Sequence, residues 1–424
     1  MNRVVVTGMG ALTSYGLGVE TLWNNLLGGE SIIKNIPSSW KLLPESEGIY
    51  SPLPRLNYKE LGFSKMELMQ YEPVNLNMLV AIDEALKSAH INYTLVNNKL
   101  NSYDIKNIDM NKFGVFVGTG IGGVATLTKN VMNIQNMKRG ESGRIDTFTI
   151  AKAMPNNVAA SAGIKLGLHR HINSYAYACS TGTITIGKAY ESIKSGLLDI
   201  AIAGSSEYFD ETGAAYNAFL KAKTIITDGD PLIANRPFDK KRSGFLFSDG
   251  ASGVLVLESL EHAKSRNANI LAEIVGFQES FDGFNMVSGD PSGIYIQEMF
   301  ENLLNEANID PRDIDYINAH GTGTVKNDEV ESEVFEKLFG NNVAINSTKS
   351  LLGHTIAASG SIEAIVTVLS IKEQKIHKNN GLKEPIRDLN FVQKNTFLDI
   401  EYAISNSSAF GGHNGALLFK KYST

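Results

Sequence analysis

The sequence has very little cysteine, since Cys179 is the only one among 424 residues. A single thiol excludes an intrachain disulfide and with it the class of small, disulfide-stapled secreted domains. The N-terminal residues MNRVVVTGMG contain no basic n-region and no cleavage site, and they run directly into a strand-like pattern. Together these features predict a cytoplasmic protein.

Long apolar runs and an excess of positive charge are also missing. Asp, Glu, Lys or Asn interrupts each hydrophobic stretch before it reaches the length of a membrane-spanning helix, which predicts a soluble protein with no membrane partner. The 39 Lys and Arg residues are outnumbered by 45 Asp and Glu, and the net charge is -6. Because phosphate backbones are bound by basic surfaces, we expect no nucleic acid partner and instead a small acidic or neutral ligand.

What the sequence does contain is an alternation of short β-branched runs with longer helical patterns, which predicts an α/β fold. The elements form two sets that meet near residue 260, so an internal duplication is expected, although no repeat is visible residue by residue. Segments 28–70 and 220–243 are predicted to be long surface excursions. Strands are predicted at residues 3–8, 112–120, 172–178, 199–207, 253–259, 269–277, 314–323, 343–350 and 416–421, and helices at 75–90, 183–196, 295–308, 328–340 and 361–374.

Two glycine-rich stretches resemble nucleotide-binding loops only in part. VTGMGAL follows a predicted strand but lacks the third glycine of a dinucleotide fingerprint and the acidic residue after a second strand. GTGIGG, at residues 118–123, has no clear βαβ unit behind it. Tight packing or close approach of a ligand accounts for GTGIGG better than a nucleotide cofactor does.

Cys179 stands in the stretch ACSTG, where a predicted strand passes into a predicted helix. The start of a helix favours a thiolate by up to about 2 kcal/mol, which is roughly one and a half pKa units for a thiol whose pKa is normally about 8.5. A nucleophile at this turn is one interpretation. A buried thiol that fills the core is the other, because free cysteines are among the most buried residues.

Two of the eight histidines differ from the rest. His320 and His354 each lie beside a glycine after a predicted strand, where an imidazole has room to face a ligand. Two imidazoles and one thiol suit a reaction that forms an enolate beside a thioester, because imidazoles stabilise the oxyanion while the thiol carries an acyl group. A zinc site is the alternative, but these residues lack the short ligand spacing of zinc motifs.

Taken together, several motifs give the chain a resemblance to the elongating β-ketoacyl-ACP synthases of the thiolase superfamily, including the ketosynthases of type II polyketide systems. ACSTG, HGTGT, STKS, GH and FGGHN occur in the family's order, and RPFDKKRSGFLFSDGASGVLVLE resembles a long family signature. The second histidine favours the elongating branch over the initiating enzymes, which use a Cys-His-Asn set. Thiolases pair two cysteines, whereas this chain has only one. The resemblance implies a thiolase-like five-layer αβαβα fold made of two similar halves, with residues 1–259 carrying Cys179 and residues 260–424 carrying both histidines.

The resemblance also implies roles for individual residues. Cys179 would take the acyl chain from an acyl carrier protein, and His320 and His354 would assist decarboxylation of malonyl-ACP. No metal and no bound cofactor are expected, because 4'-phosphopantetheine arrives on the carrier protein. The remaining family positions are Lys349, paired by analogy with Glu331; Phe410, as gate and as oxyanion-hole amide together with that of Cys179; Thr322 and Thr324, on the pantetheine arm; and Ile121, in the acyl pocket. Without the resemblance, Glu331 is interpreted as part of a solvated helix face and the two threonines as turn hydroxyls.

The sequence departs from the bacterial fatty-acid enzymes at the gate and at the carrier-docking positions. Ser408, Ala409 and His413 stand in the gate loop where those enzymes have a bulky aromatic, a glycine and a threonine, and Asn285 and Val287 replace His and Thr. Basic docking residues are few: Lys65 is kept, while Met69, Gln70 and Glu72 are nearby and Asp228 lies where Arg is common.

HGTGTVKND is closer in spelling to type II polyketide ketosynthases than to the fatty-acid enzymes. Two versions of one chemistry therefore stay open: fatty-acid elongation, and a polyketide ketosynthase that works with a chain-length-factor homologue. Either a homodimer or that heterodimer would be built on the edge of the sheet. A non-catalytic structural partner is the third possibility.

Overall fold

The computed structural model describes residues 1–42, 48–96, 100–209, 212–227, 230 and 233–423. One large mixed sheet runs through the molecule in the order β13-β12-β16-β17-β11-β1-β10-β9-β7-β8, with the short β2 paired to β1. Its strands are β1 (Val4–Thr13), β2 (Gly16–Leu17), β7 (Phe113–Gly118), β8 (Ile172–Tyr175), β9 (Ile200–Tyr208), β10 (Gly250–Ser259), β11 (Ala272–Phe281), β12 (Tyr316–Asn318), β13 (Ala344–Asn346), β16 (Tyr402–Ser408) and β17 (His413–Lys420).

The sheet consists of two five-stranded parts with the same topology. From its outer edge inward, each part contains its third, second, fourth, fifth and first strand in chain order: β8-β7-β9-β10-β1 and β13-β12-β16-β17-β11. In each, the outer three strands are parallel and the inner two are antiparallel. The parts join where β1 pairs with β11. The predicted pair of similar halves is therefore confirmed, and we propose the division after Ser259, at the end of β10.

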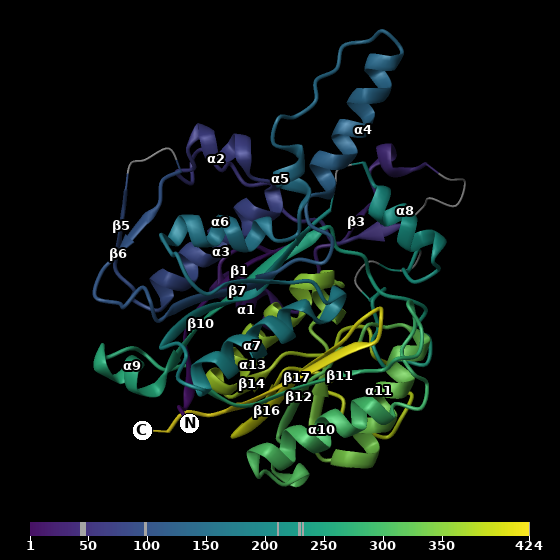
Figure 1. Ribbon diagram of the computed structural model, residues 1–424. Helices are drawn as coiled ribbons and strands as arrows, with labels where there is room; N and C mark the ends of the chain where they lie inside the picture. Colours follow the sequence, from purple (N-terminus) through teal and green to yellow (C-terminus); the bar gives the residue numbers. More distant parts are fainter. Residues whose placement is uncertain (43–47, 97–99, 210–211, 228–229, 231–232, 424) are drawn as a thin grey trace.

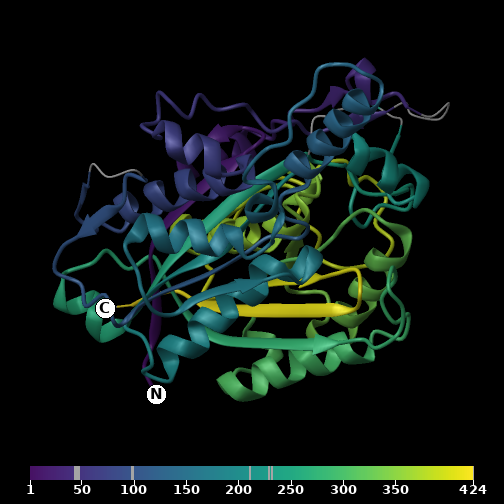
Figure 2. The same ribbon diagram turned by 45° about the horizontal axis from the view of Figure 1, so that its top comes forward.

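Helices and sheet parts alternate in five layers (Figure 1). Helices α3 (Pro73–Ser88) and α6 (Asn157–Leu166) cover the outer face of the first part, and α10 (Ile294–Ala307) and α11 (Val325–Phe339) lie outside the second. Figure 2 shows β17 and β11 side by side with α10 beneath them. Helices α7 (Thr181–Lys194) and α13 (Ser359–Glu373) lie between the two parts and contact strands of both. This arrangement confirms the predicted αβαβα fold.

The two central helices, α7 and α13, pack against each other and against both parts of the sheet. Because α13 is covered on both sides, it needs no polar face, and it is buried from Ser359 to Ile371. The two helices also approach closely at glycines. A Cβ on Gly182 would lie 2.3 Å from the backbone N of Ser361, and one on Gly360 would lie 2.6 Å from that of Thr183. The starts of α7 and α13 are thus held together, and both lead into the functional site.

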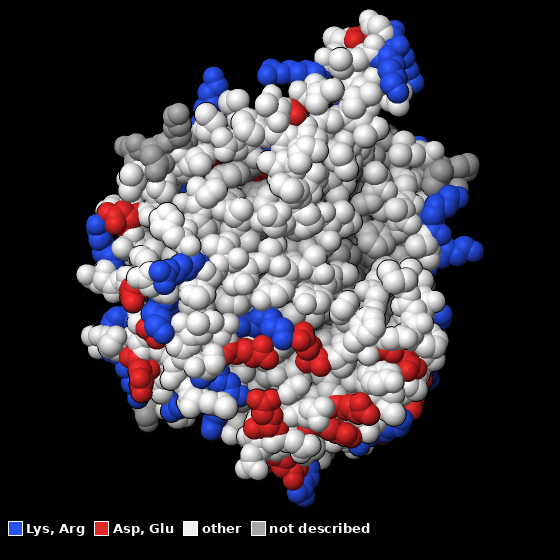
Figure 3. Space-filling view, viewed as in Figure 1, with Lys and Arg blue, Asp and Glu red and all other residues white. Residues whose placement is uncertain are grey.

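Each predicted strand and helix has a counterpart, but the strand predicted at 343–350 ends at Asn346 and residues 349–352 form a short helix instead. Several other elements were not predicted. Strand β16 is absent from the prediction, as is α4 (Val124–Lys138), which projects from the body of the molecule (Figures 1 and 3). The described parts of segments 28–70 and 220–243 are mostly irregular, as expected. The remaining elements are α1 (Val19–Gly28), α2 (Lys65–Gln70), α5 (Thr149–Ala153), α8 (Ala214–Lys221), α9 (Leu260–Ser265), α12 (Lys349–Leu352), β3 (Lys34–Asn35), β4 (Ile49–Tyr50), β5 (Tyr93–Leu95), β6 (Tyr103–Ile105), β14 (Lys375–Ile376), β15 (Thr396–Phe397) and the 3-10 helices η1 (Ser38–Trp40), η2 (Ala178–Ser180), η3 (Pro311–Asp313) and η4 (Ile356–Ala358).

Candidate active site

Cys179 lies at a sharp turn between β8 and α7. Ala178, just before it, adopts a left-handed conformation with φ of 45°, and Thr181 Oγ1 accepts a hydrogen bond from the backbone N–H of Tyr177. Left-handed φ values are strained for a residue with a Cβ and are found where the surrounding structure enforces them. The turn places the Cys179 side chain against a cavity of about 1020 Å³.

The cavity brings together most of the residues that the sequence singled out. Cys179, His320 and His354 line it, although they are far apart in the chain. Also in the lining are Thr322, Thr324, Ser408, Ala409, Phe410, Asn285 and Val287. Ile121 is not in the lining; its side chain is about half exposed on the surface of this chain.

Burial, and not the helix start, dominates the state of the Cys179 thiol. Only 6% of the residue is exposed, and burial raises the pKa of the thiol to about 12. The positive charge of Lys349 and the backbone N–H of Phe410 act in the opposite direction without compensating. The sequence-based expectation of a partly ionised thiol is therefore wrong for the free enzyme, because the desolvation of the thiolate outweighs the favourable helix end.

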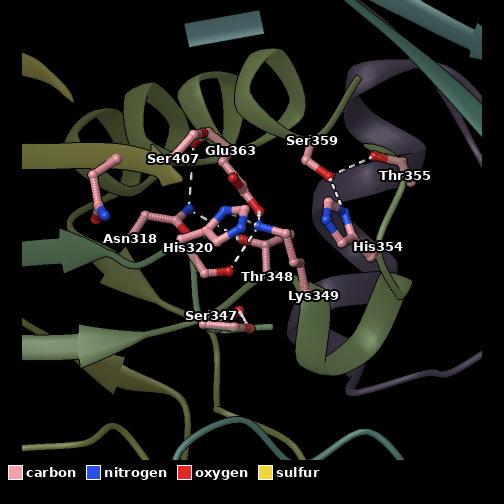
Figure 4. A network of polar contacts seen from close by, with 12 residues as sticks. Asn318, His320, Ser347, Thr348, Lys349, His354, Thr355, Ser359, Glu363 and Ser407 are labelled. Atoms are coloured by element: carbon pink, nitrogen blue, oxygen red, sulfur yellow. Dashed lines mark hydrogen bonds and ion pairs between the residues drawn. The ribbon is translucent and has the colours of Figure 1, made fainter. Parts of the chain in front are cut away.

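Lys349 is the centre of a buried polar network (Figure 4). Its ammonium group donates to the backbone oxygen of His320 over 2.7 Å, to Nδ1 of His320 over 3.1 Å and to Oε1 of Glu363 over 2.5 Å. Both members of the Lys349–Glu363 ion pair are at least 98% buried. The predicted pairing of Lys349 with Glu331 is wrong: Glu363, which projects from α13, takes that place.

Glu331 acts on the backbone instead. It is 2% exposed on α11, so it does not belong to a solvated helix face. Its two carboxylate oxygens accept hydrogen bonds from the backbone N–H groups of His320 and Gly321, over 2.7 and 2.8 Å, and Asn406 donates a third. Glu331 therefore fixes the loop after β12 that carries His320.

His354 is held by its own segment. The backbone N–H of Ile356 donates to Nδ1 over 3.2 Å, and the hydroxyl of Ser359 lies 3.0 Å from the same atom. Because a backbone N–H cannot accept, Nδ1 of His354 is the acceptor and the ring proton of the neutral imidazole is on Nε2. Lys349, an ammonium donor, imposes the same tautomer on His320.

Both imidazoles are neutral at physiological pH. Burial lowers the pKa of His320 and of His354 well below the ordinary value, and the charge of Lys349 lowers both further. The two rings are nearly perpendicular, with centroids 5.5 Å apart. The site thus holds two neutral rings that each carry a proton on Nε2, beside one thiol. Such a pair can donate two hydrogen bonds to a developing oxyanion.

The other sequence candidates lie around this centre. Phe410 is 36% exposed, and its backbone N–H acts on the Cys179 thiol and lowers the pKa of that thiol. Thr322 and Thr324 are hydrogen-bonded to each other over 2.9 Å on the cavity wall. His413 does not line the cavity but packs its ring against Tyr177.

The docking positions named from the sequence have different surroundings. Lys65 and Met69 are exposed on α2. Glu72, by contrast, is buried and accepts a hydrogen bond from the backbone N–H of Thr126, so it contributes little to the surface. Asp228 lies outside the described residues.

No role was predicted from the sequence for three residues that hold the site: Glu363 and Ser359, through their side chains, and Ile356, through its backbone N–H. The only signal for Glu363 was a lone carboxylate within the apolar first part of a predicted helix, at residues 361–371. Among the described residues, no group of three or more His, Cys, Asp and Glu side chains is placed to hold a metal ion. Within the same part of the chain, no helix has the length and apolar character needed to cross a membrane.

Comparison with known families decides the classification. The family models described as "Beta-ketoacyl synthase, N-terminal domain" and "Beta-ketoacyl synthase, C-terminal domain" match residues 1–263 and 271–383. The chain belongs to the beta-ketoacyl synthase family. The resemblance seen in the sequence is thereby confirmed, and the chain is a condensing acyltransferase.

Named relatives cover nearly all of the chain. The 3-oxoacyl-[acyl-carrier-protein] synthase 2 of Staphylococcus aureus (strain N315) is 35% identical over 99% of this chain and 98% of its own length. The enzyme of the same name from Synechocystis sp. is 33% identical over 99% and 98%.

Solved structures agree on the fold. A beta-ketoacyl synthase from Burkholderia phymatum STM815 has a TM-score of 0.87 at 28% identity, and the ishigamide ketosynthase/chain length factor one of 0.86 at 27%. The AntDE:AntF ketosynthase, solved with its type II polyketide acyl-carrier protein, has 0.85 at 26%. All three comparisons cover 100% of both chains.

Proposed function

We propose that this chain is a β-ketoacyl-ACP synthase that condenses an acyl chain on Cys179 with malonyl-ACP and releases CO2. The observation that carries the proposal is the pair of fixed tautomers beside the thiol: Lys349 and the Ile356 N–H both donate to an Nδ1, so His320 and His354 each keep a proton on Nε2. The names of the full-length relatives agree with this assignment.

In the first half-reaction, the sulfur of Cys179 attacks the thioester carbonyl of acyl-ACP. A C–S bond forms to Cys179, the bond to the pantetheine sulfur breaks, and the thiol proton passes to that leaving sulfur. The backbone N–H groups of Cys179 and Phe410 receive the transient oxyanion. Because the free thiol is held protonated, attack requires the proton to leave as the C–S bond forms.

In the second half-reaction, malonyl-ACP loses CO2 and the electron pair of the broken C–C bond forms an enolate. The Nε2–H groups of His320 and His354 donate to the enolate oxygen. The enolate carbon attacks the acyl-Cys179 carbonyl, the C–S bond breaks, and β-ketoacyl-ACP leaves. The Cys179 thiolate then takes a proton from solvent. Thr322 and Thr324 lie on the cavity wall, where they would hold the pantetheine arm.

Ile121 remains a proposed acyl-pocket residue, although it lies outside the cavity of this single chain. We propose that the chain works as a dimer, in which a second subunit would enclose that position. Strand β8 is an edge strand, and α4 exposes Leu127, Val131, Met132, Ile134 and Met137. Much of the face seen in Figure 3 below α4 is uncharged. We place the enzyme in the cytoplasm with no bound cofactor.

The decisive experiment mixes the purified protein with acyl-ACP and then with malonyl-ACP. We expect an acyl mass on Cys179 in the first step and β-ketoacyl-ACP with CO2 in the second, both abolished in Cys179→Ala. Absence of the adduct from the wild type would favour the non-catalytic structural partner.

A polyketide ketosynthase is the second candidate, because two of the similar solved structures are a type II polyketide ketosynthase and a ketosynthase/chain length factor. Purification with and without the products of neighbouring genes separates the two. An active homodimer supports fatty-acid elongation, whereas activity that requires a cysteine-less homologue supports the polyketide version.

A further inference from the structure

Glu207 is a buried carboxylate that the proposed mechanism does not use. It lies near the end of β9 and has no exposed surface. Thr119 Oγ1 donates to it over 3.1 Å and the backbone N–H of Gly120 over 3.0 Å. The backbone N–H groups of Ile121 and Ala357 also act on this carboxylate and lower its pKa. Burial raises the pKa of Glu207 to about 7.

The donor set identifies the form of Glu207 that the fold requires. Three of its four partners are backbone N–H groups, which donate and cannot accept. A carboxylate ion offers about four acceptor positions, whereas a protonated carboxyl would turn one O–H toward a donor. No ion pair to Glu207 occurs within the described part of the chain. Its charge is therefore balanced by N–H and O–H dipoles from two separate segments.

One of these segments reaches His354. The carbonyl of Ala357 accepts a hydrogen bond from Ser205 Oγ over 2.7 Å, and its N–H acts on Glu207. Ile356, directly before it, has a left-handed φ of 51° and donates its N–H to Nδ1 of His354. A strained residue of this kind keeps its conformation only while its neighbours hold it. Glu207 thus acts on Ala357, the residue that follows the strained Ile356.

The other segment is the loop after β7. A Cβ on residue 120 would lie 2.4 Å from Oε2 of Glu207, so glycine at this position is what allows the carboxylate to approach the backbone. The same added Cβ would lie 3.5 Å from Cβ of Ala357, which shows that the two segments meet over the carboxylate. Ile121 continues this loop.

We propose that Glu207 is a positioning residue, whose carboxylate ties loop 119–121 to residues 356–357 and thereby holds the ring of His354 and places a negative charge near Cys179. The tie itself is independent of the proposed function, and only its effect on decarboxylation rests on that function. Three charged groups act on the thiol of Cys179: Lys349, which favours the thiolate, and Glu207 and Glu363, which disfavour it. The nearby rings of His320 and His354 are neutral.

The test compares Glu207→Gln with Ser206→Ala. Ser206 is the preceding residue on β9, and its hydroxyl bonds to Val74 and Ser252, away from the Glu207 contacts. In Glu207→Gln, the amide NH2 faces a backbone N–H and the charge is gone. We expect backbone amide exchange in peptides covering 119–123 and 353–358 to become about tenfold faster or more, as a released local contact allows. Alkylation of Cys179 by iodoacetamide should become faster at every pH between 7 and 9.

The same variant should lose decarboxylation of malonyl-ACP by about tenfold to a hundredfold, because the His354 donor is misplaced. General loosening of the fold would also speed alkylation and slow decarboxylation, so this combination supports the proposal only when the Tm is unchanged. Ser206→Ala should match the wild type in all three measurements.

Unchanged exchange in both peptides would overturn the proposal, and so would alkylation that slows in parallel with decarboxylation. If the wild type fails to decarboxylate malonyl-ACP, the proposed function fails, while the exchange and alkylation results still decide the role of Glu207.

Discussion

The backbone N–H of Ile356 donates a hydrogen bond to Nδ1 of His354 over 3.2 Å, and this contact determines which ring nitrogen carries the proton. Ile356 follows His354 by only two residues, and its backbone has a left-handed conformation. The equivalent contact at His320 comes from a side chain, Lys349. The two imidazoles therefore reach the same state by unrelated means, which leads to separate predictions.

His354→Ala should lower decarboxylation of malonyl-ACP by about a hundredfold to a thousandfold, the usual effect of removing one oxyanion donor. Transfer of an acyl group to Cys179 should be far less affected, because His354 donates to the enolate of the second step. His354→Gln, whose amide N–H reaches a similar position, is the matched control and should retain part of the rate. Single-turnover assays of each half-reaction check this, and equal losses in both steps would contradict the assignment.

Lys349→Met should destabilise the fold by about 3–5 kcal/mol, because it leaves the Glu363 carboxylate buried without its partner. The double variant Lys349→Met with Glu363→Gln should recover part of that loss. Denaturant unfolding measures both. A single variant as stable as the wild type would show that the pair does not contribute as described.

Lys349→Met should also slow alkylation of Cys179, since the lysine charge lowers the thiol pKa.

In the wild type, the alkylation rate should rise with pH through pH 9 without a plateau, because the thiol pKa is raised to about 12. A plateau below pH 8 would contradict the buried, protonated thiol.

His377 makes a specific contribution to acid stability. Burial lowers its pKa to about 4, and its ring lies between Thr348 Oγ1 and the carbonyl of Lys378. A depressed histidine pKa means that the unfolded chain binds the proton more tightly, so stability is complete above pH 6.5 and is lost as the pH falls toward 4. The loss amounts to about 3 kcal/mol. His377→Gln should therefore lose less free energy of unfolding than the wild type between pH 6.5 and 4, as measured by denaturant titration at each pH. An equal loss of the free energy of unfolding in the variant and the wild type would contradict this prediction.

Gly182→Ala should disturb both catalytic segments through the helix crossing. The added Cβ meets the backbone of Ser361 at 2.3 Å, and overpacking of this kind costs about 1–3 kcal/mol. We expect a lower Tm and reduced condensation. Gly28→Ala, whose Cβ finds its nearest neighbour 3.5 Å away in the Glu30 side chain, is the control and should leave both unchanged.

The sequence was sufficient for the α/β class, for the amphipathic helices and for Cys179, His320 and His354, because each depends on a local pattern or a family motif. Strand β16 was missed because its residues include Ser and Asn, which are poor strand formers when no partner is known. In the structure Ser405, Asn406 and Ser407 are buried, and the amide of Asn406 donates to Glu331.

The partner of Lys349 could not be predicted from the sequence for a different reason. Glu363 follows it by 14 residues, on a helix whose burial from both sides hides any preference for one face. Glu331 is also buried near the network. The sequence does not show that Glu363 binds the ammonium group while Glu331 binds the backbone. The thiol pKa likewise depends on burial, which no local pattern encodes.

The division of the site between the two halves of the sheet has one more consequence. Cys179 belongs to the first copy of the strand pattern and both histidines to the second, so neither copy contains a complete set of reacting groups. Fragments 1–259 and 260–424 would each be chemically silent, and any turnover from their mixture would report directly that the two had reassembled.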